Sequence, residues 1–154
     1  MDATVVSIQI APEAGADLQM LQEAELVAGK GIVGDRDHTE VHKQLTLVEA
    51  EQIEKFNAEA GLAIEASDTR RNITTRGVAL NELVGKRFRV GEVEVRGAEL
   101  CHPCEYIAGR LREAYSISNL SKAEIVSGLA DRAGIRAEIL TGGTVRVGDP
   151  IRIS

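Results

Sequence analysis

The feature that most constrains the fold is a series of short runs in which apolar and polar residues alternate, separated by glycines. Alternation with a period of two is typical of β-strands that have one buried face. The runs predict about eight strands, at 4–10, 23–27, 44–48, 87–90, 92–95, 135–140, 144–147 and 151–153. Gly91 lies between the fourth and fifth runs and Gly142-Gly143 between the sixth and seventh, so two of the connections are predicted to be hairpins.

Helical signals are fewer and lie between the strand runs. Ser121 and Glu124 have the spacing of a capping box, which predicts a helix that starts there and ends before Gly134. Two further helices are predicted at 49–60, ending at Gly61, and from Pro103 through Leu111. Many short strands with few helices favour a mostly β fold with peripheral helices, of the α+β class, built around a β-barrel.

Length and composition narrow the possible functions. A chain of 154 residues is expected to form one domain, spanning 1–154. Its net charge of −6, its 3% of aromatic residues and its lack of tryptophan argue against a nucleic-acid platform. No apolar run approaches the roughly 20 residues that a membrane helix needs, and the N-terminus lacks a signal peptide. We therefore expect no membrane association and a cytoplasmic location.

Positive charge is concentrated in one part of this acidic chain. Residues 70–96 hold seven basic and three acidic residues, a net of +4, whereas residues 1–69 have a net of −10. Arginine outnumbers lysine by 13 to 5, a bias toward the planar side chain that binds phosphate or carboxylate with two hydrogen bonds. The pattern indicates an anionic ligand held locally, although arginines placed on exposed strands for solubility would give the same counts.

Cys101-His102-Pro103-Cys104 is the most informative segment, and it contains both cysteines of the chain. Proline is common in the first helical turn, so Cys104 is predicted to lie in that turn. Unpaired N–H groups there favour an anionic, nucleophilic thiolate. His102 beside it would add positive charge or shuttle a proton.

Four interpretations of the cysteine pair stay open from the residues alone. Both thiols can be small buried apolar groups, or they can form a thioredoxin-like redox pair. They can complete a zinc site with His38 and His42, because the spacings within both pairs suit zinc. Alternatively, a single thiolate holds a soft metal or carries a persulfide.

Two arginine-bearing segments offer ligand-binding side chains. In the glycine-rich turn at 31–36, Arg36 either pairs with the preceding aspartate to fix the loop or faces a ligand. If the second segment is a strand, Arg70 and Asn72 share one face, where they would grip a phosphate, and Arg71 takes the other. An exposed edge strand blunted by arginines is the alternative for the same residues.

Taken in order, these segments resemble the MOSC family, which is named for the C-terminal domain of molybdenum cofactor sulfurase. No single motif is highly specific, but order and spacing agree from about residue 5 to the end of the chain. The matching runs are 31–36, 44–49, 71–73, 77–80, 83–88, 91–93, 101–104, 134–137 and 142–150. The chain is similar to a small standalone bacterial-type member.

The resemblance implies a β-barrel related to the one in pyruvate kinase, and it implies chemistry of molybdenum cofactor or of sulfur. In the family's amidoxime-reducing members, the conserved cysteine that matches Cys104 ligates molybdenum. The residue two positions before it, here His102, contacts the cofactor. Those members also carry an extra N-terminal subdomain that has no clear equivalent in this sequence.

The resemblance also assigns roles to several polar residues. An Arg-x-Asn motif that helps to bind the pterin and its phosphate matches Arg70-Arg71-Asn72. A further contact near the C-terminal strands falls close to Arg136, where the residue type differs from that of the relative. Arg71 and Arg36 are additional candidates for binding the same anionic group.

The function that the resemblance implies is reduction of small N-hydroxylated compounds by bound molybdenum cofactor. A partner reductase would supply the electrons, because the sequence has no flavin or iron–sulfur motif. One alternative is sulfur transfer, in which Cys104 carries a persulfide from a sulfur donor protein and Cys101 resolves it as a disulfide. Another is a module without catalysis that binds the cofactor or is stabilised by zinc.

Overall fold

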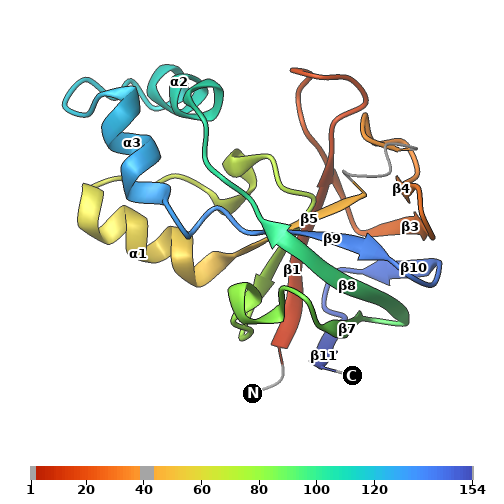
Figure 1. The fold of residues 1–154 in the computed structure, drawn as a ribbon. Coiled ribbons are helices and arrows are strands. Elements are labelled where there is room, and N and C mark those ends of the chain that lie inside the picture. Colours follow the sequence, from red (N-terminus) through yellow and green to blue (C-terminus); the bar gives the residue numbers. More distant parts are fainter. Residues whose placement is uncertain (1–2, 39–43, 154) are drawn as a thin grey trace.

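Residues 3–38 and 44–153, which the computed structural model describes, form eleven strands and three α-helices (Figure 1). The strands are β1 (Ala3–Ile10), β2 (Gln19–Leu21), β3 (Glu23–Val27), β4 (Gly31–Ile32), β5 (Leu45–Glu49), β6 (Ile73–Arg76), β7 (Arg87–Val90), β8 (Val93–Leu100), β9 (Ile135–Ile139), β10 (Gly143–Arg146) and β11 (Pro150–Ile153). The α-helices are α1 (Ala50–Ala60), α2 (Glu105–Ala114) and α3 (Lys122–Leu129), and two short 3₁₀ helices are η2 (Ala66–Thr69) and η3 (Leu80–Leu83).

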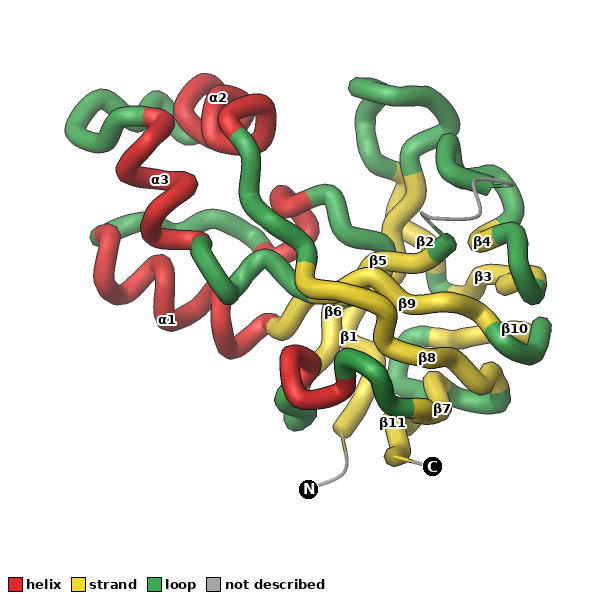
Figure 2. Tube along the Cα trace, viewed as in Figure 1, coloured by secondary structure: helices red, strands yellow, loops and turns green. Residues whose placement is uncertain are grey.

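Seven of these strands close into a barrel. Their order is β11-β7-β8-β9-β5-β6-β1, and the ring closes where β1 pairs with β11. At that closure Ala3 lies opposite Ile151, and Thr4 lies opposite Pro150. β2 pairs with the far end of β1, and β10, β3 and β4 form a separate three-stranded sheet. The predicted fold class, a mostly β barrel with peripheral helices, is confirmed (Figure 2).

The barrel is filled by the side chains on one face of its strands. In β7, Phe88 and Val90 are fully buried, whereas Arg87 and Arg89 point outward. Further apolar residues complete this core, among them Ile8, Leu26, Leu45, Leu47, Ile73, Val95, Ile135 and Ile139. Because side chains pack the interior, ligands can bind only at the ends of the barrel or on its outer surface.

The three α-helices lie together on one side of the barrel (Figure 1). β5 and β6 pair in parallel, an arrangement that requires a crossover connection, and α1 supplies it. Ile53 and Phe56 of α1 join Ile107, Leu111 and Ile125 in a second apolar cluster. We call α1, α2 and α3 the helical layer. No helix in the described ranges combines the length and apolarity needed to cross a membrane.

Predictions that rested on local signals are confirmed. The Ser121 hydroxyl accepts a hydrogen bond from the Glu124 N–H at 3.1 Å, and the Glu124 carboxylate accepts one from the Ser121 N–H at 3.0 Å. Gly61 ends α1 in the left-handed conformation, with φ of 70°. β7 and β8 form the hairpin expected around Gly91.

Predictions about non-local pairing and helix ends were less accurate. The hairpin expected around Gly142-Gly143 does not form, since β9 pairs with β8 and β5 and has no free edge for β10, which pairs with β3 instead. α2 begins at Glu105 rather than at Pro103, and α3 ends at Leu129 rather than next to Gly134. The alternating runs also do not include β2, β4 and β6; β2 and β4 have only three and two residues, and β6 directly follows the arginine-bearing segment at 70–72.

Candidate functional site

Four arginines from three separate parts of the chain line one cavity of about 420 Å³, which we call the arginine cavity. They are Arg36, Arg70, Arg71 and Arg136. Thr46 of β5 also lines the cavity, and its Cα pairs across the strands with that of Arg136 in β9. The structure thus brings together four arginines that the sequence analysis selected from three segments far apart in the chain.

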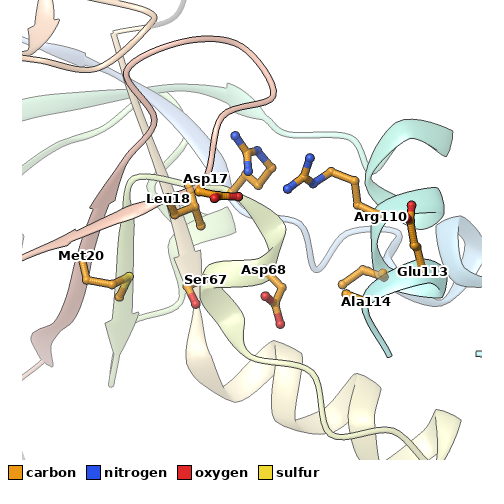
Figure 3. A pocket seen from close by; sticks show the side chains of 10 residues that line it. Asp17, Leu18, Met20, Ser67, Asp68, Arg110, Glu113 and Ala114 are labelled. Carbon is orange, nitrogen blue, oxygen red and sulfur yellow. The ribbon is translucent and has the colours of Figure 1, made fainter. Parts of the chain in front are cut away.

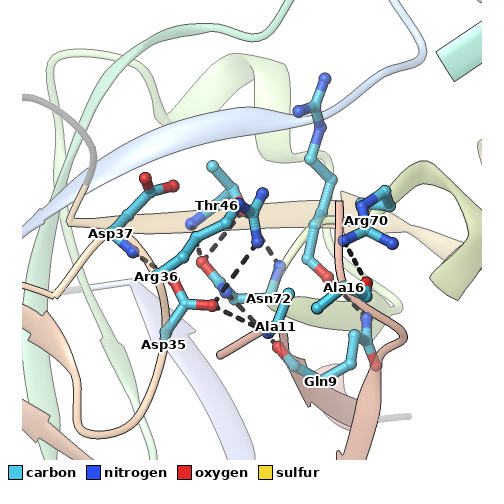
Figure 4. Close-up of polar contacts among 10 residues, drawn as sticks. Gln9, Ala11, Ala16, Asp35, Arg36, Asp37, Thr46, Arg70 and Asn72 are labelled. Carbon is cyan, nitrogen blue, oxygen red and sulfur yellow. Dashed lines mark hydrogen bonds and ion pairs between the residues drawn. The ribbon is translucent and has the colours of Figure 1, made fainter. Parts of the chain in front are cut away.

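Alternation along a strand predicts that Arg70 and Asn72 share one face, and this prediction is wrong. Arg70 ends η2 in the left-handed conformation, with φ of 64°, and its Nη2 donates a hydrogen bond to the Ala16 carbonyl at 2.7 Å. The Asn72 side-chain oxygen accepts hydrogen bonds from the N–H and the hydroxyl of Thr46, at 3.0 and 3.1 Å. Asn72 is therefore engaged in joining β5 to the start of β6 (Figure 4), and it is not a lining residue of the arginine cavity.

The sequence leaves open whether Arg36 pairs with Asp35 or faces a ligand, and in the structure its side chain does the first and also lines the cavity. Its Nη1 lies 3.6 Å from the Asp35 carboxylate, and its side chain also lines the cavity. Asp35 is buried and accepts hydrogen bonds from the N–H groups of Ala11 at 3.1 Å and Asp37 at 3.3 Å. Asp35 therefore fixes the turn that carries Arg36 (Figure 4).

The guanidinium groups of the arginine cavity have few negative partners. Within the described ranges, Arg70 and Arg71 form no ion pair, and Arg136 approaches the Glu99 carboxylate at 3.9 Å. Burial lowers the pKa of Arg70, and the charges of Arg110 and Arg36 lower it further. A bound anion would relieve this repulsion and accept hydrogen bonds from several arginines at once.

Cys101 is buried beside the arginine cavity. Its N–H donates a hydrogen bond to the Gly134 carbonyl at 2.8 Å, which ties the end of β8 to the start of β9. Burial raises the pKa of the Cys101 thiol, and the neighbouring Arg71 and Arg136 offset part of that rise. The sequence does not predict this contact between the first cysteine and two arginines of the cavity.

Cys104 has a different environment. It is the N-cap residue of α2 rather than a residue of the first turn, with an extended backbone at φ of −131°. Its carbonyl accepts a hydrogen bond from the Ala108 N–H at 3.1 Å, while its thiol is exposed, as is the neighbouring His102. The N-cap position still lies beside the unpaired N–H groups of the first helical turn, which stabilise a bound or local anion.

A metal site built from several side chains does not form in the described part of the chain. No group of three or more His, Cys, Asp or Glu residues within 3–38 and 44–153 lies close enough together to hold a metal ion. His38 is described, whereas His42 lies outside the described residues. The zinc set of Cys101, Cys104, His38 and His42 therefore has no complete counterpart here.

The sequence analysis missed two contributors to this region. The loop at 12–17, between β1 and β2, lines the arginine cavity through Pro12, Glu13 and Ala14. Arg110 of α2 lies near enough for its charge to act on Arg70. A proline and a glycine mark the loop in the sequence, but no local signal separates Arg110 from an ordinary solvent-facing arginine on a helix.

Comparisons with known proteins show what the chain is similar to. The family model described as MOSC domain matches residues 34–152. The structure of YuaD from Bacillus subtilis has a TM-score of 0.87 and 18% identity, with 98% of this chain and 94% of that chain covered. YiiM from Geobacillus stearothermophilus has a TM-score of 0.71 and 17% identity, covering 99% of this chain and 75% of that chain.

YiiM from Escherichia coli is also similar, with a TM-score of 0.67 and 18% identity over 98% of this chain and 69% of that chain. At such identities the likeness to solved structures concerns the fold alone. No curated protein sequence matches the chain.

Proposed function

The chain belongs to the MOSC domain family, and from this premise we propose that it binds molybdenum cofactor and reduces N-hydroxylated compounds. The observation that carries the proposal is the convergence of Arg36, Arg70, Arg71 and Arg136 on one cavity. Cys101 lies beside two of these arginines, and three residues span at most about 11 Å. Cys104 is therefore within reach of an elongated ligand whose anionic end occupies the cavity.

The chemistry of these residues suits the cofactor. Its pterin carries a phosphate, and guanidinium groups donate paired hydrogen bonds to phosphate oxygens. Molybdenum held by the cofactor would also need a ligand from the protein. The exposed thiol of Cys104 is a soft ligand of the kind that such a centre accepts.

The residues of the chain have separate tasks in this proposal. Arg70, Arg71 and Arg136 hold the phosphate, and Asn72 fixes the backbone that carries Arg71 through its hydrogen bonds to Thr46. The exposed imidazole of His102 exchanges protons with solvent near the metal ligand. When bound, the cofactor supplies a metal that accepts electrons and passes them to an N–O bond.

The proposed reaction needs two electrons, which a donor outside the chain supplies. One N–OH group takes up two electrons and two protons and becomes N–H, with release of water. The electrons come from a partner reductase. Exposure of Cys104 and His102 at the start of α2 leaves this part of the site accessible to a substrate.

A second candidate function is sulfur transfer, and the exposure of Cys104 is the observation that favours it. A donor persulfide would pass its outer sulfur to the Cys104 thiolate. Attack by Cys101 would then release hydrosulfide and leave a Cys101–Cys104 disulfide, which an external dithiol reduces. This route requires Cys101 to leave its buried position, because its thiol is almost fully covered.

Metal and mass analysis tests the two functions on protein purified from a host that makes the cofactor. We expect near-stoichiometric molybdenum, a loss of at least about tenfold in Cys104→Ser, and retention in the matched variant Cys101→Ala. Less than about a tenth of a molybdenum per chain, with stoichiometric zinc, would overturn the proposal. A mass increase of one sulfur atom that Cys104→Ser abolishes and Cys101→Ala retains or increases would favour sulfur transfer instead.

A further inference from the structure

A second cavity, of about 550 Å³, adjoins the arginine cavity. It lies between η2, the end of the loop that precedes β2, and the second half of α2, and we call it the α2 cavity (Figure 3). Arg70 lines both cavities and forms the partition between them. The volume of the α2 cavity lies within the range of small-molecule sites.

The inner end of the α2 cavity is positively charged. Arg70 is 6% exposed, and one of its donors is used by the Ala16 carbonyl. Arg110 projects into the cavity from α2 (Figure 3) and is oriented by Tyr106, with its Nη1 3.3 Å from the phenol oxygen. Neither arginine forms an ion pair with a carboxylate of the described ranges. The charge of Arg110 lowers the pKa of Arg70, and the charge of Asp17 offsets part of that effect. A carboxylate bound between them would remove this repulsion.

The middle of the cavity is apolar. Leu111 forms part of its floor and is almost fully buried, and Leu18 and Met20 contribute from the opposite side. Met20 is 60% exposed. An aliphatic segment lying here would cover part of that exposed surface.

The rim is negatively charged. Asp17 and Glu113 are exposed and border the cavity on two sides (Figure 3). Asp68 also lines it, but its carboxylate is engaged by the hydroxyl of Tyr115 and by the N–H of Glu65. Glu113 therefore supplies negative charge on the α2 side of the cavity, whereas Asp17 lies close enough to Arg70 for their charges to interact.

We propose that the α2 cavity is a second ligand site, which binds small carboxylates that carry a basic group at the opposite end of an aliphatic chain. The carboxylate lies between Arg70 and Arg110, the chain lies against Leu111, and the basic group faces Glu113. The site does not depend on the molybdenum chemistry proposed above. Because Arg70 is shared, occupation of either cavity changes the affinity of the other by the same factor.

Methyl NMR of the purified protein tests the site with three aliphatic probes of matched length. The chain has two methionines, and the variant Met20→Leu assigns the signal of Met20 in protein labelled at methionine methyl groups. We expect 6-aminohexanoate to shift that signal saturably with a dissociation constant on the order of 1 mM. Hexanoate should bind a few-fold more weakly, and hexylamine should give no saturable shift.

Two substitutions separate the inner and outer ends of the site. Arg110→Gln should weaken both carboxylate probes about tenfold, whereas Arg96→Gln, a matched change on β8, should leave them unchanged. Glu113→Gln should weaken 6-aminohexanoate about threefold and leave hexanoate unaffected. These positions are exposed or half-exposed, so all three variants should fold.

Three outcomes would overturn the proposal. The first is the absence of a saturable Met20 shift with 6-aminohexanoate at about 50 mM, far above the expected dissociation constant. The second is binding of hexylamine as tightly as the carboxylates. The third is an unchanged affinity in Arg110→Gln. Each of these results comes from the methyl signal of Met20, which lines the α2 cavity. The test of this site is therefore independent of whether molybdenum is found at Cys104.

Discussion

The barrel and the helical layer are held together in different ways. Each barrel strand pairs with a neighbour on both sides, so backbone hydrogen bonds run around a closed ring. The helical layer packs through its apolar cluster, with local polar links such as the Asn57 side chain, which bonds both backbone groups of Ile64. We therefore expect the barrel to be the more rigid region and the helical layer to open first.

The two cavities draw on both regions. Thr46 and Arg136 are set by paired barrel strands, whereas Cys104 and Arg110 are carried by α2 and are more accessible. The comparison indicates that the barrel sets the positions of the cavity-lining residues, whereas α2 carries the side chains that solvent can reach. In the proposed function, the barrel side would fix where an anion binds, and the helical side would bring exposed reactive and charged groups to it.

The largest effect is expected at the boundary between the two regions, from Gly134→Ala. Gly134 has φ of +94°, and a Cβ there would overlap the carbonyl oxygen of Leu47 in the barrel. We expect a loss of about 5 kcal/mol or failure to fold, measured by urea unfolding. The matched variant Gly29→Ala has φ of +73° but open space around the new atom, so it should cost only about 1 kcal/mol. Similar losses in both variants would show that the boundary is not rigid.

A smaller difference is expected between the two fully buried phenylalanines. Phe88 lies in the barrel core, and Phe56 packs in the helical layer against Gly128 of α3. Phe88→Ala should cost about 4 kcal/mol and Phe56→Ala about 3 kcal/mol, because helices can relax toward a cavity more readily than paired strands. Amide exchange measures the distribution of the effect. Faster amide exchange in α1 and α3 alone after Phe56→Ala would support the difference in rigidity between the helical layer and the barrel. Equal acceleration in the barrel strands would contradict it.

The smallest effect is expected from the cap of α3. Ser121→Ala removes one hydrogen bond to the helix N-terminus and should cost about 1 kcal/mol in thermal unfolding. Hydrogen bonds from Ser121 lower the pKa of Glu124 below its ordinary value of 4.5. The capping contribution of Glu124 is therefore complete above pH 4.5 and is lost as the pH falls below it. In Ser121→Ala this acid dependence should weaken, and an unchanged dependence would contradict the assignment.

Sequence alone was sufficient where neighbours in the chain are also neighbours in space. The Ser121 capping box and the β7–β8 hairpin depend on contacts within a few residues, so their residue types identify them. Gly142-Gly143 carries an equally strong turn signal, yet the strands on its two sides pair elsewhere. Which strand is adjacent is decided by closure of the ring, and no local pattern contains that information.

The candidate site shows the same division. The two arginine-bearing segments pointed to Arg36, Arg70 and Arg71, the family resemblance added Arg136, and tertiary structure brings all four together. The argument from alternation placed Arg70 and Asn72 on one face, but the left-handed turn at Arg70 interrupts the extended backbone on which alternation depends. Arg110 could not be selected at all, because its role arises only where α2 packs beside Arg70.

The closure between β1 and β11 also has a consequence for how the protein is made. The pairing joins Ala3 and Thr4 to Ile151 and Pro150, almost the full length of the chain apart. At ordinary synthesis rates, the ribosome needs on the order of ten seconds to add the residues between them. During that time β1 has an open edge, the feature most prone to pair with another chain. Protection of that edge during synthesis is therefore a requirement that the topology itself imposes.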